Sequence, residues 1–189
     1  MMCGRYTLFT DTEAMEIRDI IEQVQRSNPD TPIKTGEIFP TNTVPILLND
    51  KLRPEAAIWG FPNYARKGVI INARSETAPE KKTFKNPMLT SRCVVPSTGF
   101  YEWTQDDKKI KYLFARKTLP LYMAGLYSDF AGERRFVILT TAANSSVADV
   151  HNRMPVILES EELKAWASDT HAAFDILSRM PPPLARTKA

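Results

Sequence analysis

A thiol stands close to the start of the chain, in the sequence MMCGRYT, where Cys3 precedes Gly4 and Arg5. If both leading methionines are removed, Cys3 carries a free α-amine beside its thiol. If they remain, it is an ordinary internal cysteine. The other cysteine, Cys93, lies in the apolar run RCVVP, and we expect it to be a small core residue. Cys3 has no such apolar setting, so the choice is between a chemical role and a disordered end.

Three internal motifs place polar side chains beside strand-like apolar runs. If Glu102 faces inward, burial should raise its pKa and suit it to proton transfer near neutral pH; if it faces outward, it meets only water. His151, with an ordinary pKa of about 6.5, suits proton transfer, although a single histidine is more often a surface or packing residue. The motifs are INARSET, with Asn72, Arg74 and Glu76; STGFYEW, with Glu102; and VHNRMPVIL, with His151 and Arg153.

The amide and guanidinium groups of these motifs have two possible uses. Asn72 follows three apolar residues, and a buried asparagine must be hydrogen-bonded, so it is either a structural brace or a polar member of a site. Arg5, Arg74 and Arg153 have planar guanidinium groups that suit phosphates. The alternative is that they pair with acidic residues such as Glu76.

The composition is that of an ordinary globular domain, with 189 residues, 43% hydrophobic and 25% charged. The apolar runs are far shorter than the roughly 20 residues of a membrane-spanning helix, and the start lacks the pattern of a signal peptide. Two cysteines and two histidines favour neither a disulfide framework nor a zinc site. We therefore expect a cytoplasmic protein with no metal and no cofactor.

Positive charge is concentrated in the middle third of the sequence. Residues 51–117 hold 14 Lys and Arg against 6 Asp and Glu, whereas residues 1–50 hold 4 against 8. Basic and aromatic side chains together are typical of surfaces that follow a phosphate backbone and stack on unpaired bases. The alternative is a solvated basic face over an ordinary aromatic core. The basic segment contains Trp59, Phe61, Tyr64, Phe100, Tyr101 and Trp103.

Apolar periodicity predicts the elements that must position these residues. Residues 10–29 predict a helix whose buried face holds Ile17, Ile20, Ile21 and Val24. Seven short strand-like runs follow, separated by turns and charged clusters. They are AAIWGF, GVIINA, RCVVPS, IKYLFAR, LYMAGLY, RRFVILTT and MPVIL.

The carboxyl-terminal part predicts two helices, in SEELKAWAS and HAAFDILSR, and then a proline-rich end. We expect residues 181–189 to be a loose tail, because three successive prolines cannot continue a helix. Short strands without long intervening helices favour an α+β fold with a curled, mostly antiparallel, barrel-like sheet and flanking helices. We expect a single domain over residues 1–189.

Four motifs together are more specific than any one of them. CGRY, INARSET, GFYEW and HNRMPVIL occur in this order and at similar spacing in the SRAP family, the SOS response-associated peptidase-like proteins, which the chain resembles from Cys3 to about Leu158. That family includes bacterial proteins and a human sensor that crosslinks to abasic sites in single-stranded DNA. The resemblance implies one SRAP-like domain that acts in the response to DNA damage, near the nucleoid if the source is bacterial.

The resemblance implies that Cys3 reacts covalently with DNA. In the family, the exposed cysteine attacks the ring-opened aldehyde of an abasic deoxyribose and forms a thiazolidine that shields the lesion. A thiazolidine needs an amine and a thiol on adjacent carbons, and an α-amine with a pKa of about 7.7–8.0 is partly neutral at physiological pH. Asn72 would match the family asparagine that orients the cysteine. Glu102 and His151 would match the glutamate and histidine that move protons during ring opening and dehydration.

The resemblance also implies the DNA contacts and the partner. Such a protein binds abasic single-stranded DNA as a monomer, nearly independently of sequence and more weakly as salt rises. Trp59 would match an aromatic residue that packs against the bases or wedges them apart, and Thr140 a residue that lines the cysteine pocket. The expected DNA-binding residues are Arg5, Pro40, Trp59, Arg74, Thr140 and Arg153.

The chain departs from the family pattern at both ends. Met1 and Met2 precede Cys3, where the family has one methionine, so either translation starts at Met2, or Met1 is an artefact, or self-cleavage frees the cysteine. The sequence also finishes soon after the last motif, where family members commonly carry a further segment. Two alternatives stay open: a cysteine-type peptidase with Cys3 and His151 as nucleophile and base, which includes processing of its own amino terminus, and a non-catalytic single-stranded DNA binder.

Overall fold

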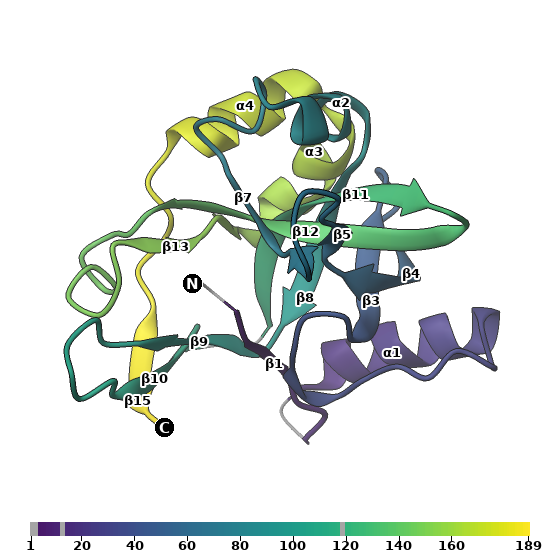
Figure 1. The fold of residues 1–189 in the computed structure, drawn as a ribbon. Helices are drawn as coiled ribbons and strands as arrows, with labels where there is room; N and C mark the ends of the chain where they lie inside the picture. The colour runs from purple at the N-terminus through teal and green to yellow at the C-terminus, as the bar shows by residue number, and fades with distance from the viewer. Residues whose placement is uncertain (1–3, 12–13, 118–119) are drawn as a thin grey trace.

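The computed structural model describes residues 4–11, 14–117 and 120–189, and its centre is a closed barrel (Figure 1). Strand pairing runs through five strands and returns to the first, and all neighbours are antiparallel except the first two, which are parallel. The expected α+β fold with a curled, mostly antiparallel sheet is therefore confirmed. In order around the barrel, the strands are β12 (Glu133–Ala142), β4 (Arg53–Trp59), β3 (Thr43–Leu48), β8 (Arg92–Ser97) and β11 (Leu121–Phe130).

A second, five-stranded antiparallel sheet carries the amino-terminal strand. In spatial order its strands are β15 (Ala185–Lys188), β10 (Lys111–Ala115), β9 (Gly99–Trp103), β1 (Tyr6–Leu8) and β2 (Gly36–Ile38). Because β1 is paired on both sides, the backbone just after the first residues is held inside the sheet rather than at its edge.

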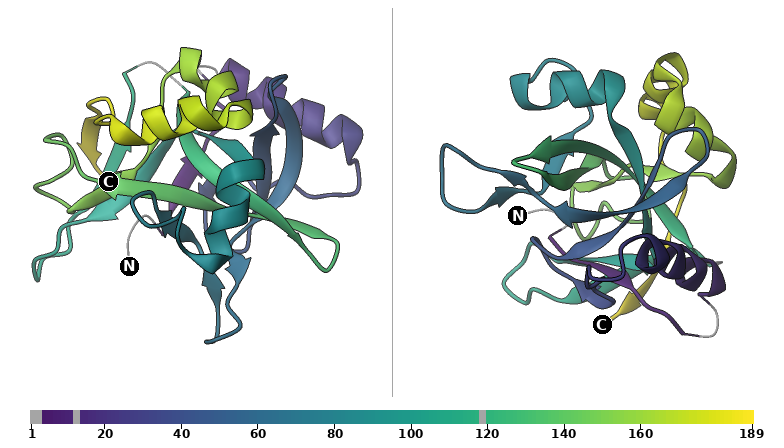
Figure 2. Two further views of the ribbon diagram at one scale, coloured as in Figure 1. Left: turned by 90° about the horizontal axis from the view of Figure 1, so that it is seen from above. Right: turned by 90° about the vertical axis from the view of Figure 1, so that its right-hand side faces the viewer.

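Five short strands and the helices complete the fold. The strands β7 (Asn72–Arg74) and β13 (Arg153–Pro155) pair with β12, β14 (Ile157–Leu158) pairs with β11, and β5 (Phe61–Pro62) forms a hairpin with β6 (Val69–Ile70). The helices α2, α3 and α4 lie on one side of the barrel strands, and α1 lies on another (Figures 1 and 2). The helical segments are α1 (Met15–Ser27), α2 (Lys82–Thr90), η1 (Ser160–Glu162), α3 (Leu163–Ser168) and α4 (Thr170–Ser178).

Strand β12 shows why the central part of a barrel strand is apolar at successive positions. Phe136 and Ile138 belong to one apolar cluster, and Val137 and Leu139, which point the other way, belong to the cluster that includes residues of α2, α3 and α4. Successive side chains of a strand point to opposite faces, so a strand buried on both faces has no polar alternation.

Helix α1 has the predicted buried face of Ile17, Ile20, Ile21 and Val24. The predicted start at residue 10 is wrong: the helix begins at Met15, and Ala14, at the N-cap, makes no side-chain capping bond. Alanine has no side-chain acceptor for the first free N–H groups.

The expectation of a loose tail at residues 181–189 is also wrong. Residues 185–188 form β15, which pairs with β10, and the Ala189 N–H donates to the carbonyl of Lys111 (3.0 Å). The three prolines do end the helical region, and Asn144 Nδ2 donates to the carbonyls of Pro181 and Pro182 (2.9 Å each). The exposed edge of β10 has unpaired backbone groups that an extended segment satisfies, whatever its side chains are.

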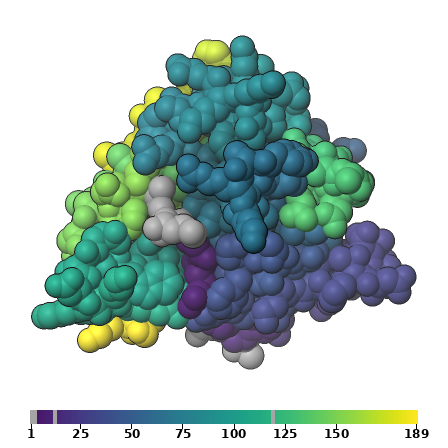
Figure 3. Space-filling view, in the orientation of Figure 1, coloured from purple at the N-terminus to yellow at the C-terminus, as the bar shows by residue number. Residues whose placement is uncertain are grey.

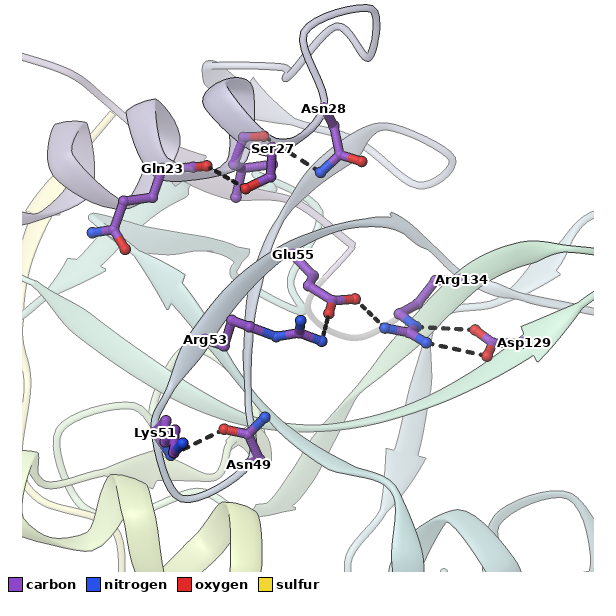
Figure 4. Close-up of polar contacts among 10 residues, drawn as sticks. Gln23, Ser27, Asn28, Asn49, Lys51, Arg53, Glu55, Asp129 and Arg134 are labelled. Carbon is purple, nitrogen blue, oxygen red and sulfur yellow. Dashed lines mark hydrogen bonds and ion pairs between the residues drawn. The ribbon is translucent and has the colours of Figure 1, made fainter.

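An ionic network ties β4 to the β11–β12 hairpin (Figure 4). The Glu55 carboxylate accepts hydrogen bonds from both Arg53 and Arg134. Arg134 also pairs with Asp129 at 3.0 and 3.2 Å and lies 5.1 Å from the centre of the Tyr127 ring. The network braces the barrel at the seam where β4 and β12 run parallel.

Arg92 joins two helices to the barrel from inside the protein. Its side chain is buried and donates hydrogen bonds to the carbonyls of Trp166 (2.7 Å), Met88 (2.8 Å) and Leu89 (3.0 Å). These carbonyls belong to the last turns of α2 and α3, where helices leave acceptors unpaired. Arg92 therefore sets the position of α2 relative to β8.

Replacement of Arg92 should destabilise the protein through these carbonyls. We expect Arg92→Met to lower the free energy of unfolding by about 2–4 kcal/mol, because buried acceptors lose charged donors. Chemical denaturation followed by circular dichroism measures it. The control is Arg26→Met, which removes an exposed pair with Glu22 and should cost less than about 0.5 kcal/mol. Equal effects of the two substitutions would contradict the bracing role of Arg92.

Candidate functional site

The amino-terminal strand runs between two groups of candidate residues. Cys3 lies outside the described residues, which begin in this region at Gly4. Tyr101 N–H donates to the carbonyl of Arg5 (2.9 Å), so the register of β1 and β9 carries Gly4 toward Glu102. On the other side, a Cβ placed on Gly4 would lie 3.9 Å from Cδ1 of Ile71. Gly4 therefore lies between the strand that holds Glu102 and the residue before Asn72.

A pocket of about 500 Å³ brings three of the predicted residues together. Strand β7 pairs in parallel with β12, with Asn72 opposite Ile138 and Arg74 opposite Thr140. Asn72 is half-buried, Arg74 is exposed and Thr140 is buried. Helix α2, which contains Pro87 and which the sequence analysis did not predict, lines the pocket with Thr83 and Phe84, and Lys81 lines it just before the helix.

His151 lies outside this pocket, in a second one of about 390 Å³ between residues 104–106 and 148–152. Its ring Nδ1 accepts a hydrogen bond from the backbone N–H of Arg153 (3.0 Å). Because Nδ1 is the acceptor, the neutral ring carries its proton on Nε2. Burial lowers the pKa of His151, and the nearby charge of Arg153 lowers it too, against the backbone hydrogen bond, which raises it. At neutral pH the ring is therefore uncharged and can donate from Nε2.

Arg153 has the second of its two predicted uses, pairing with an acid. Its Nη2 donates to the Glu76 carboxylate (2.8 Å) and to the Thr140 carbonyl (2.7 Å), and Nη1 donates to the other Glu76 oxygen. These contacts lower the pKa of Glu76, first through the hydrogen bond from Arg153. The pair clamps β13 to the turn after β7 and so fixes the backbone next to His151.

The Arg5 guanidinium lies between two aromatic rings and beside a carboxylate. It is 4.4 Å from the centre of the Phe39 ring and 5.3 Å from that of Trp103, and Nη1 is 3.4 Å from the Glu37 carboxylate. Glu37 also accepts from Lys111 (2.8 Å), and this bond is the main reason that its pKa is lowered. Pro40, which the resemblance predicts to contact DNA, is half-buried and lies in the turn after Phe39. Stacking orients Arg5 while leaving most of its N–H groups outside strong ion pairs.

Of the two orientations considered for Glu102, facing inward or facing outward, the structure has the inward one. Glu102 lies on β9, opposite Tyr112 of β10, and is 2% exposed. The structure therefore places a buried carboxylate on the strand beside Gly4, and the half-buried amide of Asn72 on the barrel side.

Trp59 does not have the predicted contact with bases, and that expectation is wrong. The side chain is fully buried, and its Nε1 donates to the carbonyl of Ile71 (3.1 Å). Its ring packs edge-on against Tyr6 (5.1 Å between centres) and parallel to Phe136 (6.5 Å). Trp59 instead holds the backbone immediately before Asn72.

The exposed aromatic of the basic segment is Tyr64, at 88% exposure, in the loop between β5 and β6. The β5–β6 hairpin that carries it lies beside α2 on one face of the molecule (Figure 3). Six exposed cations surround these elements, and none forms an ion pair with any residue that the structure describes. They are Arg66, Lys67, Arg74, Lys81, Lys82 and Lys85. Composition pointed to this segment, but only the fold selects Tyr64 from its aromatic residues.

Cys93 is the buried core residue that the sequence predicts. It is fully buried, and desolvation raises the pKa of its thiol well above the ordinary value. A thiol that cannot ionise is a poor nucleophile, so Cys93 takes no part in the site.

The described part of the chain holds no group of three or more His, Cys, Asp or Glu side chains arranged to bind a metal ion. Within the same ranges, no helix has the length and apolar character needed to cross a membrane.

The fold and the grouped side chains define a class of protein: a small α+β barrel whose polar edge faces its own amino-terminal strand. A family model described as SOS response associated peptidase (SRAP) matches residues 2–187. The chain belongs to this family, as its four motifs predict.

Relatives agree with this assignment, and a solved structure has the same fold. The chain is 35% identical to the abasic site processing protein YoqW of Bacillus subtilis, covering 95% of this chain and 86% of that protein. It is 28% identical to the abasic site processing protein YedK of Escherichia coli, covering 87% and 79%. A crystal structure of a protein from Bacteroides thetaiotaomicron has the same fold, with a TM-score of 0.76, 24% identity and coverage of 98% and 91%.

The pKa of His151 provides a direct test of its environment. We expect its ring to titrate with a midpoint below about 6.5, because the buried ring loses solvation when charged. The folded state then binds its proton less readily than the unfolded state, so this residue's contribution to stability falls as the pH drops below about 6.5. Proton NMR titration measures the midpoint, and His171→Gln leaves one histidine for assignment. A midpoint at or above 6.5 would contradict the burial effect.

Proposed function

We propose that this chain recognises abasic sites in single-stranded DNA and binds them covalently through Cys3, once the residues before it are removed. One observation carries the proposal: Gly4, the neighbour of Cys3, lies between the strand that holds Glu102 and the residue before Asn72. Family membership and relatives named abasic site processing proteins support the choice of lesion.

The proposed reaction joins the free α-amine and thiol of Cys3 to the C1′ aldehyde of the opened sugar. The amine adds to the aldehyde, loss of water gives an imine, and the thiolate adds to the imine carbon to close a thiazolidine. The net change is the release of one water, so no oxidant, metal or other co-reactant is needed. Opening the sugar and expelling water both require proton transfer.

The side chains suggest a division of these proton transfers. Neutral His151 carries its proton on Nε2 and, in that state, donates a hydrogen bond to an oxygen that gains negative charge. Glu102 is a buried carboxylate on the strand beside Gly4 and is the candidate for taking up and returning protons. Asn72 lines the pocket and is the candidate for orienting Cys3.

DNA binding is proposed for the face with Tyr64 and the six exposed cations. Cations free of internal partners bind phosphates without first breaking an ion pair, and binding of this kind weakens as salt rises. Arg74 and Arg5 extend this charge toward the site, whereas Arg153 and Trp59 act by holding the backbone. A lesion without a base offers no edge to read, so the contacts are independent of sequence.

The adduct is tested with purified protein and an abasic single-stranded oligonucleotide on a denaturing gel. We expect a slower protein–DNA band that is absent with intact DNA and is lost in Cys3→Ala. The matched control is Cys93→Ala, which removes the buried thiol and should keep the band. Intact-protein mass establishes that the sample begins at Cys3. Processed protein that forms no adduct would contradict the covalent proposal.

The same mass measurement addresses processing of the amino terminus. We propose that loss of the leading methionines is self-catalysed, with Cys3 as nucleophile. A sample that retains them tests whether processing needs a second enzyme, and cleavage of an unrelated peptide without DNA would favour a general peptidase instead.

Tyr64 should contribute stacking to DNA binding. We expect Tyr64→Ala to weaken binding of single-stranded DNA by roughly 5- to 150-fold, since one base–aromatic contact is worth about 1–3 kcal/mol. Tyr64→Phe should bind almost like the parent protein, because stacking needs the ring and not the hydroxyl. Fluorescence anisotropy at fixed salt measures both. Equal affinities of the alanine variant and the parent would rule out the stacking contact.

A further inference from the structure

A pocket of about 580 Å³ lies between the β5–β6 hairpin, α2 and the β11–β12 hairpin. It has no assigned role in the reaction described above. It shares Ile70 and Thr83 with the pocket that holds Asn72. The two pockets are therefore adjacent along α2, and a strand that passes Asn72 can continue into the second pocket. Figure 2 shows α2 beside these two hairpins.

The pocket has apolar surfaces that suit a flat ring. Pro62, Ile70, Pro87 and Phe130 line it, and Tyr64 stands at its exposed side. The Phe130 ring is held by the buried Phe61, with 5.0 Å between ring centres. Apolar and aromatic walls fixed by the core bind planar ligands at little entropic cost.

Hydrogen-bonding groups occur at the same pocket. Pro87 lies inside α2 and has no N–H, so the carbonyl of Thr83 lacks the donor that a helix normally supplies. The side chains of Asn86 and Ser128 add an amide and a hydroxyl, and Lys82 adds a positive charge. None of the described residues that line the pocket is acidic. The apolar walls suit a planar ring, the polar groups can hydrogen-bond to its edge, and Lys82 can bind an anionic chain attached to the ring.

We propose that this pocket takes up one nucleobase of the DNA strand, next to the abasic site. The inference rests on the proposed function and adds a second recognition element to it. A base beside an abasic site has lost one stacking neighbour, so less energy is needed to turn it out of the stack. The pocket then anchors the strand on one side of the lesion and keeps the sugar at the reactive cysteine.

The test removes bases one at a time. Cys3→Ala protein, which binds without reacting, is titrated with single strands that contain one tetrahydrofuran site as a stable lesion. A second tetrahydrofuran then replaces the base at each of the neighbouring positions in turn. We expect a loss of affinity of about tenfold at a single position on one side of the lesion, and smaller losses elsewhere.

A second protein variant links that position to the pocket. The indole of Ser128→Trp fills the pocket from β11. In this variant, removal of the base at the sensitive position should no longer lower the affinity. The matched control Ser27→Trp, on the exposed end of α1, should keep this loss of affinity. Circular dichroism checks folding, and if Ser128→Trp does not fold, Asn86→Ala on the exposed side of α2 should reduce the loss at least threefold.

The outcomes separate the two proposals. If the affinity is the same at every position of the second tetrahydrofuran, and binding to the lesion remains salt-dependent, the nucleobase pocket is overturned and the proposed function stands. A positional loss that persists unchanged in both Ser128→Trp and Asn86→Ala would overturn the assignment to this pocket. Absence of any binding to single strands that contain the lesion would overturn the proposed function itself.

Discussion

The backbone of β12 hydrogen-bonds to four other strands, and the remaining structure depends on this arrangement. It pairs with β11 and β4 to close the barrel, and with the short strands β7 and β13 beyond its barrel section. Ser75 N–H and Arg153 Nη2 both reach the carbonyl of Thr140 near its end. A two-residue or three-residue strand has little stability of its own, so β7 and β13 keep their positions because β12 holds them. The INARSET and HNRMPVIL motifs meet for that reason.

The residues around the site divide into those that are available for a ligand and those that support the backbone. Trp59 donates to the carbonyl of Ile71, and the Arg153–Glu76 pair joins β13 to the turn after β7. Both use strong donors of the kind that nucleic-acid sites also use, but these donors bond to the protein itself: Trp59 inside the core, and Arg153 to the exposed carboxylate of Glu76. The buried indole N–H of Trp59, which has a satisfied partner, is difficult to detach, whereas the side chains of Tyr64 and of the exposed lysines of α2 have no such bonds to lose among the residues that the structure describes. Supporting residues thus account for the rigidity of the site, and exposed residues for its capacity to bind.

The distribution of charge follows the same division. On β4, β11 and β12, arginines are neutralised by Glu55, Asp129 and Glu133. On the face of α2 and the β5–β6 hairpin, the cations have no acidic partner within the described ranges. A small net charge of +3 over the whole chain therefore coexists with one strongly positive face, which is the arrangement that attracts a polyanion locally.

The sequence by itself determined the elements with strong periodicity and the family. Helix α1 and all seven strand-like runs follow from local apolar patterns, and four short motifs sufficed for family membership, because such information is contained in neighbouring residues. The tertiary structure decided which side chains face a ligand. Trp59 became a buried brace, Arg153 the ion-pair partner of Glu76 and residues 185–188 a strand, since burial and pairing depend on segments far apart in the chain. Helix α2, which the sequence analysis did not predict, contains Pro87, which removes one helical hydrogen bond, a local cost that packing against the barrel outweighs.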